Sequence, residues 1–220
     1  MQINPRTAAL LSAGVISFAG VLQAEEKLSP VSAALSSTTI SGYVDTSMQW
    51  NFGTGNANNP NYSFGGASKA DGFNLNVIQL SVAKPLEEGG WSAGYQVDLW
   101  FGPDANTLAS QSSGVTTSDL AIRQAYVALR TPVGNGIDWK IGVFDSILGY
   151  EVLPSPSNPN FTRSYGFTIE PTTLTGLLAA YKINDAISIS GGVVDSFGPK
   201  VDGRSNPPDA ESFKTYTGAL

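Results

Sequence analysis

The sequence predicts an all-β protein, an antiparallel up-and-down transmembrane β-barrel, and three observations lead to this prediction. Apolar and polar residues alternate along eight segments, the connections between these segments are long and short in turn, and aromatic residues gather near segment ends. The sequence stops at Leu220, within the eighth segment. Because a closed barrel leaves no strand unpaired in hydrocarbon, we expect an incomplete, N-terminal portion of a larger barrel; a complete eight-stranded barrel is the alternative.

The composition excludes several classes of function. The chain has neither Cys nor His, so it cannot form a Cys/His zinc site, a Cys nucleophile, a Ser-His-Asp triad or a disulfide. A formal net charge of -6, with 12 scattered Lys and Arg residues, argues against a nucleic-acid partner. We therefore expect no enzymatic activity, no catalytic residue, no metal and no cofactor.

Residues 1–24 are expected to be a cleaved export signal. Arg6 supplies a positive charge, an apolar run of small residues follows, and Ala24 precedes two glutamates. A retained N-terminal anchor is the alternative, and the pattern leaves the cleavage position open. Residues 25–37 show no strand pattern and are expected to form a periplasmic lead-in, which would leave 38–220 for the barrel.

Segment 91–102 shows the strand pattern most clearly. Its odd positions, which share one face, are Trp91, Ala93, Tyr95, Val97, Leu99 and Phe101. Its even positions are mostly polar, as expected for a strand between two different environments. Twelve residues at about 3.3 Å each, tilted by about 40°, rise on the order of 30 Å, which suffices for an apolar band of about 25 Å.

Seven further segments follow the same rule, and two of them contain a break in it. They are 39–52, 73–84, 120–130, 137–144, 173–182, 186–195 and one that begins near Phe213. The apolar phase slips between Val77 and Ile78, and again near Arg123 and Gln124. Each slip predicts either a β-bulge or a strand with apolar contacts on both sides.

The connections alternate in length along the chain. The long ones comprise 53–72, 103–118, 145–172 and 196–212. The short ones comprise 85–90, 131–136 and 183–185. Long loops at one end and short turns at the other are typical of an outer-membrane barrel, whereas a soluble sandwich has no reason to keep this asymmetry. The same parity places the N-terminus on the periplasmic side.

Several strings resemble a family of bacterial outer-membrane β-barrel porins. They are Ile40-Ser41-Gly42-Tyr43-Val44-Asp45, Arg123-Gln124-Ala125-Tyr126-Val127, Asp138-Trp139-Lys140-Ile141-Gly142-Val143-Phe144 and Asn160-Phe161-Thr162-Arg163-Ser164-Tyr165. Gly176 followed by Tyr181 is similar to the next strand of that family. The resemblance covers the chain from about residue 37 onward and implies an outer-membrane pore for passive diffusion of small hydrophilic solutes or ions. Members are typically longer than this chain, which agrees with an incomplete barrel.

In a pore, inward-facing charges and any loop that enters the lumen would set selectivity and width. The candidate pore-lining residues are Asp45, Asp98, Arg123, Asp138 and Lys140, of which Arg123 falls in a phase slip. The candidate constriction loop is 145–172, with the charged residues Asp145, Glu151, Arg163 and Glu170. The candidate aromatic girdle at the membrane interfaces is Trp50, Phe52, Trp91, Phe101 and Trp139. Ordinary hydrated wall residues and an external loop are the competing interpretations.

Two other functions stay open at this stage. A non-conducting barrel could act as an outer-membrane anchor or adhesin through its long loops. A secreted β-sandwich could bind carbohydrate through its tryptophans, but it would need a second sheet to bury the apolar faces. The partners expected of a porin are outer-membrane lipid and small solutes; a homo-oligomer, in particular a trimer, rests on analogy alone.

Overall fold

The computed structural model describes residues 37–50, 52, 69, 72–108, 118–198, 201–204 and 213–220. The predicted export signal and nearly all of the predicted lead-in lie outside these residues, so both stay predictions.

Eight antiparallel strands form one sheet in which each strand pairs with its neighbours in the sequence. They are β1 (Thr39–Gln49), β2 (Gly72–Lys84), β3 (Ser92–Phe101), β4 (Leu120–Thr131), β5 (Ile137–Asp145), β6 (Thr173–Lys182), β7 (Ser188–Val194) and β8 (Thr215–Ala219). This arrangement confirms the predicted all-β, up-and-down fold and every predicted strand. Strands β1, β3, β7 and β8 are shorter than predicted by a few residues, because the apolar–polar alternation continues beyond the paired residues.

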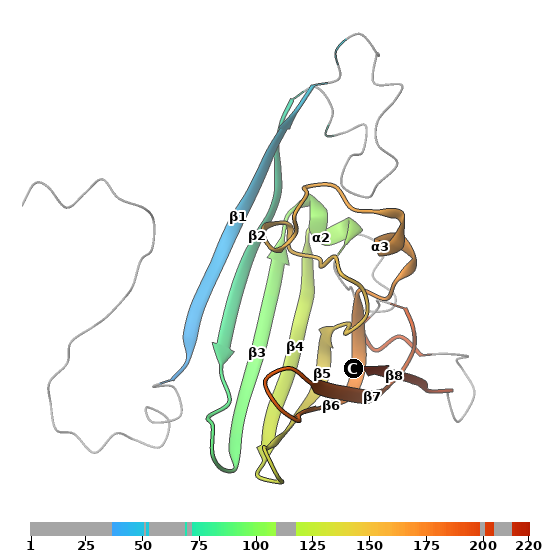
Figure 1. Cartoon of the computed structure of the whole chain (residues 1–220). Coiled ribbons are helices and arrows are strands. Elements are labelled where there is room, and N and C mark those ends of the chain that lie inside the picture. Colours follow the sequence, from blue (N-terminus) through green and yellow to red (C-terminus); the bar gives the residue numbers. More distant parts are fainter. Residues whose placement is uncertain are drawn as a thin grey trace, which may run out of the picture.

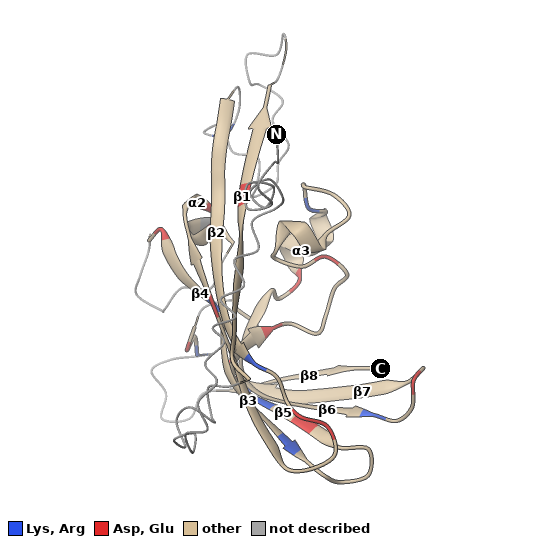
Figure 2. Cartoon of the chain, turned by 90° about the vertical axis from the view of Figure 1, so that its left-hand side faces the viewer, with Lys and Arg blue, Asp and Glu red and all other residues tan. Residues whose placement is uncertain are grey.

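The sheet is open and strongly curved. Among the described residues β1 pairs only with β2, and β8 pairs only with β7, so the described sheet is not closed, which is consistent with a partial barrel. Figure 2 shows β5–β8 turned away from the direction of β1 and β2, which gives the sheet a concave side. A single sheet also differs from the two packed sheets that a carbohydrate-binding sandwich requires, and the described strands therefore contradict that alternative.

Glycine permits the close approach of β4 and β5 at Gly142. Gly142 has φ +133°, and a Cβ atom built on it would lie 2.9 Å from Cα of Tyr126, its ladder partner. A larger residue would therefore force the two backbones apart.

Both predicted phase slips are β-bulges. In the β1–β2 ladder Asp45 pairs with Val77 and Thr46 pairs with Leu75, which leaves Asn76 as the extra residue. In the β3–β4 ladder Asp98 pairs with Gln124 and Leu99 pairs with Ile122, which leaves Arg123. An extra residue shifts the alternation by one position, and this is the shift that the sequence shows.

One face of the sheet is apolar and exposed. Its large hydrophobic residues are Ile40, Val44, Met48, Phe73, Leu75, Ile78, Leu80, Phe101, Leu120, Ile122, Val127, Leu129, Ile141, Leu177, Ile189, Val193 and Tyr216. Ladder partners share a face, and Ile78 with Phe101 and Ile141 with Leu177 show the rule. So many exposed apolar side chains on one continuous surface would be unusual in water.

The opposite, concave face carries most of the polar residues of the strands and is called the polar face below. Its members include Asp45, Gln79, Ser81, Gln96, Asp98, Arg123, Gln124, Tyr126, Arg130, Asp138 and Lys140. The two buried apolar clusters of the described residues also lie on this side. One joins strands to loops, and the other joins Phe144, Leu174, Leu178 and Val194 of β5–β7.

Short helices lie in the long connections. They are α2 (Pro103–Thr107), the 3-10 turn η2 (Ser155–Ser157) and α3 (Tyr165–Ile169). Among the described residues no helix has the length and hydropathy needed to cross a bilayer. The connection from β5 to β6, which contains η2 and α3, passes in front of β3 and β4 near α2, while the short β2–β3 and β4–β5 turns lie at the other end of the sheet (Figure 1).

Candidate functional site

A charged cluster lies on the polar face where three neighbouring strands meet. The guanidinium of Arg123 in β4 forms ion pairs with Asp98 of β3 and with Asp145, the last residue of β5. Nε2 of Gln124 donates to Oδ2 of Asp98 at 2.8 Å, and Oε1 of Gln124 accepts from the backbone N–H of Asp145 at 3.1 Å. The bulge explains this geometry, because it directs the side chains of two consecutive residues to the same face.

This cluster is largely shielded from solvent. The exposed fractions of the side chains are 2% for Asp98, 7% for Arg123 and 30% for Asp145. The sequence predicts that Asp98 and Arg123 line the pore; their side chains do lie on the polar face, but each is buried among neighbouring polar groups. Removing one partner of a buried ion pair leaves an uncompensated charge and costs about 3–5 kcal/mol. The two residues therefore act as parts of the wall rather than as solvent-facing charges.

A second polar cluster surrounds the other bulge. Nδ2 of Asn76 donates to Oδ1 of Asp45 at 3.0 Å, and the Ser47 hydroxyl donates to Oδ1 of Asn76 at 3.3 Å. Asn76 is fully buried, whereas the predicted pore-lining residue Asp45 is partly exposed. Asn76 is not among the site residues predicted from the sequence, although its position beside the phase slip is a signal that could have identified it.

The two remaining candidate pore-lining residues lie toward the turn end. Asp138 accepts two hydrogen bonds from Arg130, at 2.6 Å and 2.8 Å, so its charge is paired with an arginine that the sequence analysis did not select. Nζ of Lys140 lies 4.8 Å from the centroid of the Tyr126 ring, a cation–π contact. Asp138, Lys140 and Tyr126 also line a hollow of about 360 Å³ at this end of the polar face.

Internal hydrogen bonds order the connection from β5 to β6. Arg163 donates to four backbone carbonyls, those of Val152, Leu153, Asn160 and Phe161, at 2.8–3.2 Å. Its side chain is buried, and burial lowers the pKa of Arg163. The sequence groups Arg163 with the charges of a candidate constriction loop, and in the structure backbone carbonyls of that loop surround its guanidinium.

A capped helix holds a second charge of this loop. The Ser164 hydroxyl accepts from the backbone N–H of Phe167 at 3.4 Å and caps α3. Ser164 also donates its hydroxyl and its backbone N–H to the Glu151 carboxylate, and these bonds lower the pKa of Glu151. Glu151 therefore stabilises the loop conformation.

The loop packs on the polar face. Leu153 and Phe167 of the loop form a buried cluster with Val77, Trp100 and Ala121 of β2, β3 and β4. Ala105 and Leu108, from α2 and its C-terminal end, complete the cluster. Figure 2 shows α3 and its loop on the side toward which β5–β8 turn. The loop therefore occupies the concave side of the wall.

Helix α2 is held by a paired carboxylate. Asp104 forms an ion pair with Lys69 and is almost fully buried. Burial raises the pKa of Asp104, while the ion pair with Lys69 opposes this rise.

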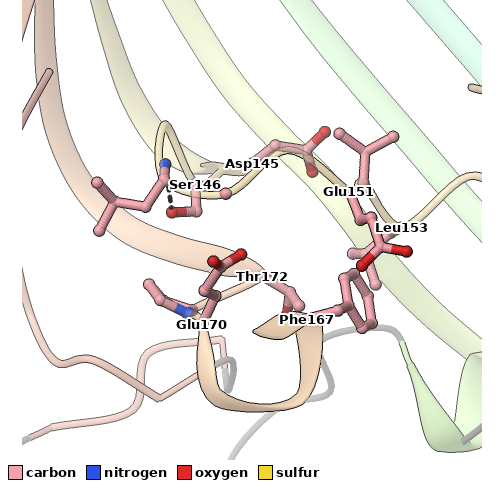
Figure 3. A pocket seen from close by; sticks show the side chains of 11 residues that line it. Asp145, Ser146, Glu151, Leu153, Phe167, Glu170 and Thr172 are labelled. Carbon is pink, nitrogen blue, oxygen red and sulfur yellow. Dashed lines mark hydrogen bonds between the residues drawn. The ribbon is translucent and has the colours of Figure 1, made fainter. Parts of the chain in front are cut away.

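A small acidic cavity separates the loop from the end of β5. Its volume is about 30 Å³, which suffices for about one water molecule. Figure 3 shows that Asp145, Glu151 and Glu170 contribute three carboxylates to its lining. The Glu170 carboxylate lies against Gly149, whose φ of +89° favours glycine. No group of three or more Asp, Glu, His or Cys residues in the described part of the chain is arranged to hold a metal ion.

The candidate girdle residues lie near the two ends of the sheet. Trp91 and Trp139 belong to the turn end, whereas Trp50, Phe52 and Phe101 belong to the loop end. Trp50 contacts Phe73 edge to face, with ring centroids 5.3 Å apart, so Phe73 extends this group at the loop end.

Comparisons with known proteins assign the chain to one family. Searches of curated proteins and of solved structures gave no significant match. A family model described as "Putative beta-barrel porin-2, OmpL-like" matches residues 37–216. This range includes strands β1 to β7 and the beginning of β8. The chain therefore belongs to the OmpL-like family of β-barrel porins.

Proposed function

We propose that the protein is a passive diffusion channel for small hydrophilic solutes or ions. Membership of a porin family implies location in the outer membrane. The channel activity, the cleavage of residues 1–24 during export and the absence of a catalytic step are parts of the proposal. Cleavage would leave Glu25 as the first residue, and N-terminal sequencing of the protein from outer membranes would test this.

The contrast between the two faces of the sheet carries the proposal. One face presents exposed Ile, Leu, Val, Met and Phe side chains, and the other presents hydrogen-bonded polar and charged side chains. A wall between hydrocarbon and an aqueous lumen requires this division. The family membership supports the same interpretation.

The proposal includes a constriction formed by residues 145–172. It is supported by the contact of Leu153 and Phe167 with residues of the polar face. A loop that lay outside the barrel would not need to bury apolar side chains against that face. The exposed Glu170 and the partly exposed Glu151 and Asp145 would then face the remaining opening.

One observation favours a second candidate function. The cluster around Trp100 and Phe167 fills part of the concave side at the loop end. If this packing closes the lumen in the full-length protein, the barrel would be a non-conducting anchor or adhesin.

Conductance distinguishes the two candidates. The full-length protein would be folded in detergent and added to a planar lipid bilayer under voltage. We expect stepwise openings, and we expect deletion of residues 150–168 to raise the conductance of each step. A folded barrel that never conducts would contradict the channel, whereas equal conductance with and without the loop would contradict the constriction alone.

A further inference from the structure

The direction in which the constriction loop leaves the wall is set at Asp145. This residue ends β5 and pairs with Thr173 at the start of β6, so the two residues form the neck of the loop. One residue further, the backbone N–H of Ser146 donates to the Thr172 carbonyl at 3.1 Å. A change in the position of Asp145 would therefore move the whole loop relative to the wall.

Two neighbouring residues of β4 hold Asp145 in place. Arg123 binds its carboxylate through one terminal nitrogen and binds Asp98 through the other. Gln124 accepts the backbone N–H of Asp145 and donates to Asp98. The planar guanidinium can bind two carboxylates at once in fixed geometry, which a lysine ammonium cannot reproduce.

The ion pairs of Arg123 and the apolar surface on which the loop packs, called the apolar seat below, both involve strands β3 and β4. Trp100 lies two residues beyond Asp98 in β3, and Ala121 lies two residues before Arg123 in β4. Trp100 and Ala121 pack against Leu153 and Phe167 of the loop. The loop is therefore fixed at its neck by charge and at its middle by packing.

We propose that Arg123 is a positioning residue that fastens the constriction loop to the wall through Asp145, with Asp98 as the buried anchor. The bulge is the structural device that makes this possible, because it adds one residue to β4 and directs its side chain between two strands. The effect on current rests on the proposed channel function, whereas the fastening of the loop does not.

A purely local role is the competing explanation. Arg123 would then only neutralise Asp98 at the bulge, and the loop would be held by Leu153 and Phe167 alone. The variant Asp145→Asn separates the two explanations, because it weakens the link to the loop and leaves the Arg123–Asp98 pair in place. Arg130→Gln is a matched control, because Arg130 belongs to the same strand and pairs with Asp138 at the end remote from the loop.

The first measurement follows the loop without using the current. The chain has no cysteine, so Leu153→Cys introduces a single thiol at a position that is 2% exposed. In this background Arg123→Gln and Asp145→Asn should each increase the rate of maleimide labelling by about tenfold or more, since labelling reports local opening. Arg130→Gln should leave the rate unchanged, and Arg123→Lys should give an intermediate rate. Circular dichroism confirms that each variant is folded.

The second measurement records single channels of the same variants without the added cysteine. We expect Arg123→Gln and Asp145→Asn to show several current levels and greater open-channel noise. Arg130→Gln changes a charge of the wall and is compared only in the number of current levels and in the noise, both of which should match those of the parent. Equal rates of maleimide labelling in Arg123→Gln, Asp145→Asn and Arg130→Gln would overturn the proposal, whether or not the protein conducts. Faster labelling of the two loop variants in a barrel that never conducts would support the fastening of the loop and reject the channel.

Discussion

The loop end and the turn end of this sheet use the same chemistry under different conditions of burial. Each end has an arginine of β4 paired with an aspartate of a neighbouring strand. At the loop end Arg123 is an extra residue in a bulge and binds the buried Asp98 and the partly exposed Asp145. At the turn end Arg130 lies in regular register opposite Asp138, and both side chains are partly exposed.

This difference in burial shows that charged side chains at the loop end stabilise the wall, whereas those at the turn end are accessible to solvent. The loop end combines two bulges, a buried ion pair and an apolar seat for the loop. The turn end has regular ladders around the polar-face hollow that Tyr126, Asp138 and Lys140 help to line. We expect stability and loop position to depend on the first region, and the entry of solutes to depend more on the second.

The largest effect is expected from a tryptophan at the loop end. Trp100→Ala removes a side chain that is 1% exposed and whose Nε1 donates to Gln79 at 2.7 Å. Loss of a buried Trp costs about 3–5 kcal/mol of unfolding free energy. Trp91→Ala at the turn end should cost much less unfolding free energy, because Trp91 is 80% exposed. Guanidinium unfolding of the detergent-folded barrel would compare the two, and equal losses would contradict the proposed difference between the ends.

Substitution of the paired aspartates should also lower the unfolding free energy more at the loop end than at the turn end. Asp98→Asn leaves the buried Arg123 with one carboxylate partner, so we expect the unfolding free energy to fall by about 3 kcal/mol. Asp138→Asn should cost about 0–1 kcal/mol, because its pair with Arg130 is partly exposed to solvent. The same unfolding experiment measures both. A loss in Asp138→Asn as large as that in Asp98→Asn would show that burial does not separate the two pairs.

The sequence predicts the eight strands and locates two phase slips, because the alternation of apolar and polar residues follows directly from the geometry of a pleated strand. That each slip is a bulge, and not a strand with apolar contacts on both sides, comes from the structure. It also places Asp98, Arg123, Asp138 and Lys140 near one face. It does not predict how much solvent reaches each residue, because that depends on neighbours from other strands. Gln124 and Arg130 were missed for this reason, and the burial of Asp98 and Arg123 could not be predicted.

The loop shows a second limit. The pattern of residues 145–172 gives length, polarity and a few apolar side chains, which suit an inward and an outward loop equally well. The sequence identifies Arg163 only as a charged residue of the candidate constriction loop, and only the fold brings four backbone carbonyls around its guanidinium. No periodicity encodes such a contact, since all four carbonyls belong to the backbone that precedes Arg163, at separations of 2, 3, 10 and 11 residues.

A smaller effect is expected from the cap of α3. Ser164→Ala removes the acceptor of the Phe167 N–H and the hydroxyl donor to Glu151, which should lower the local stability of the loop by about 1 kcal/mol. Hydrogen exchange of the loop peptide would show this change, with the β3 and β4 peptides unaffected. Ser157→Ala is the matched control, because Ser157 is an exposed serine of the same loop. Equal exchange in the two variants would exclude a role for the cap.

The smallest effect is a dependence of the loop on pH. Hydrogen bonds from Ser164 lower the pKa of Glu151, so in the folded loop this carboxylate binds its proton less readily than in the unfolded chain. The resulting stabilisation is fully present above the ordinary glutamate pKa of about 4.3 and is lost as the pH falls through the lowered value. Exchange of the loop should therefore accelerate in acid more for the parent than for Glu151→Gln, which has no charge to lose. Buried Asp104 has the opposite shift, a raised pKa, so its protonation favours the folded state as the pH falls. Comparison with Glu151→Gln, which keeps Asp104, isolates the contribution of Glu151, and identical acid profiles for the two proteins would show that this carboxylate does not hold the loop.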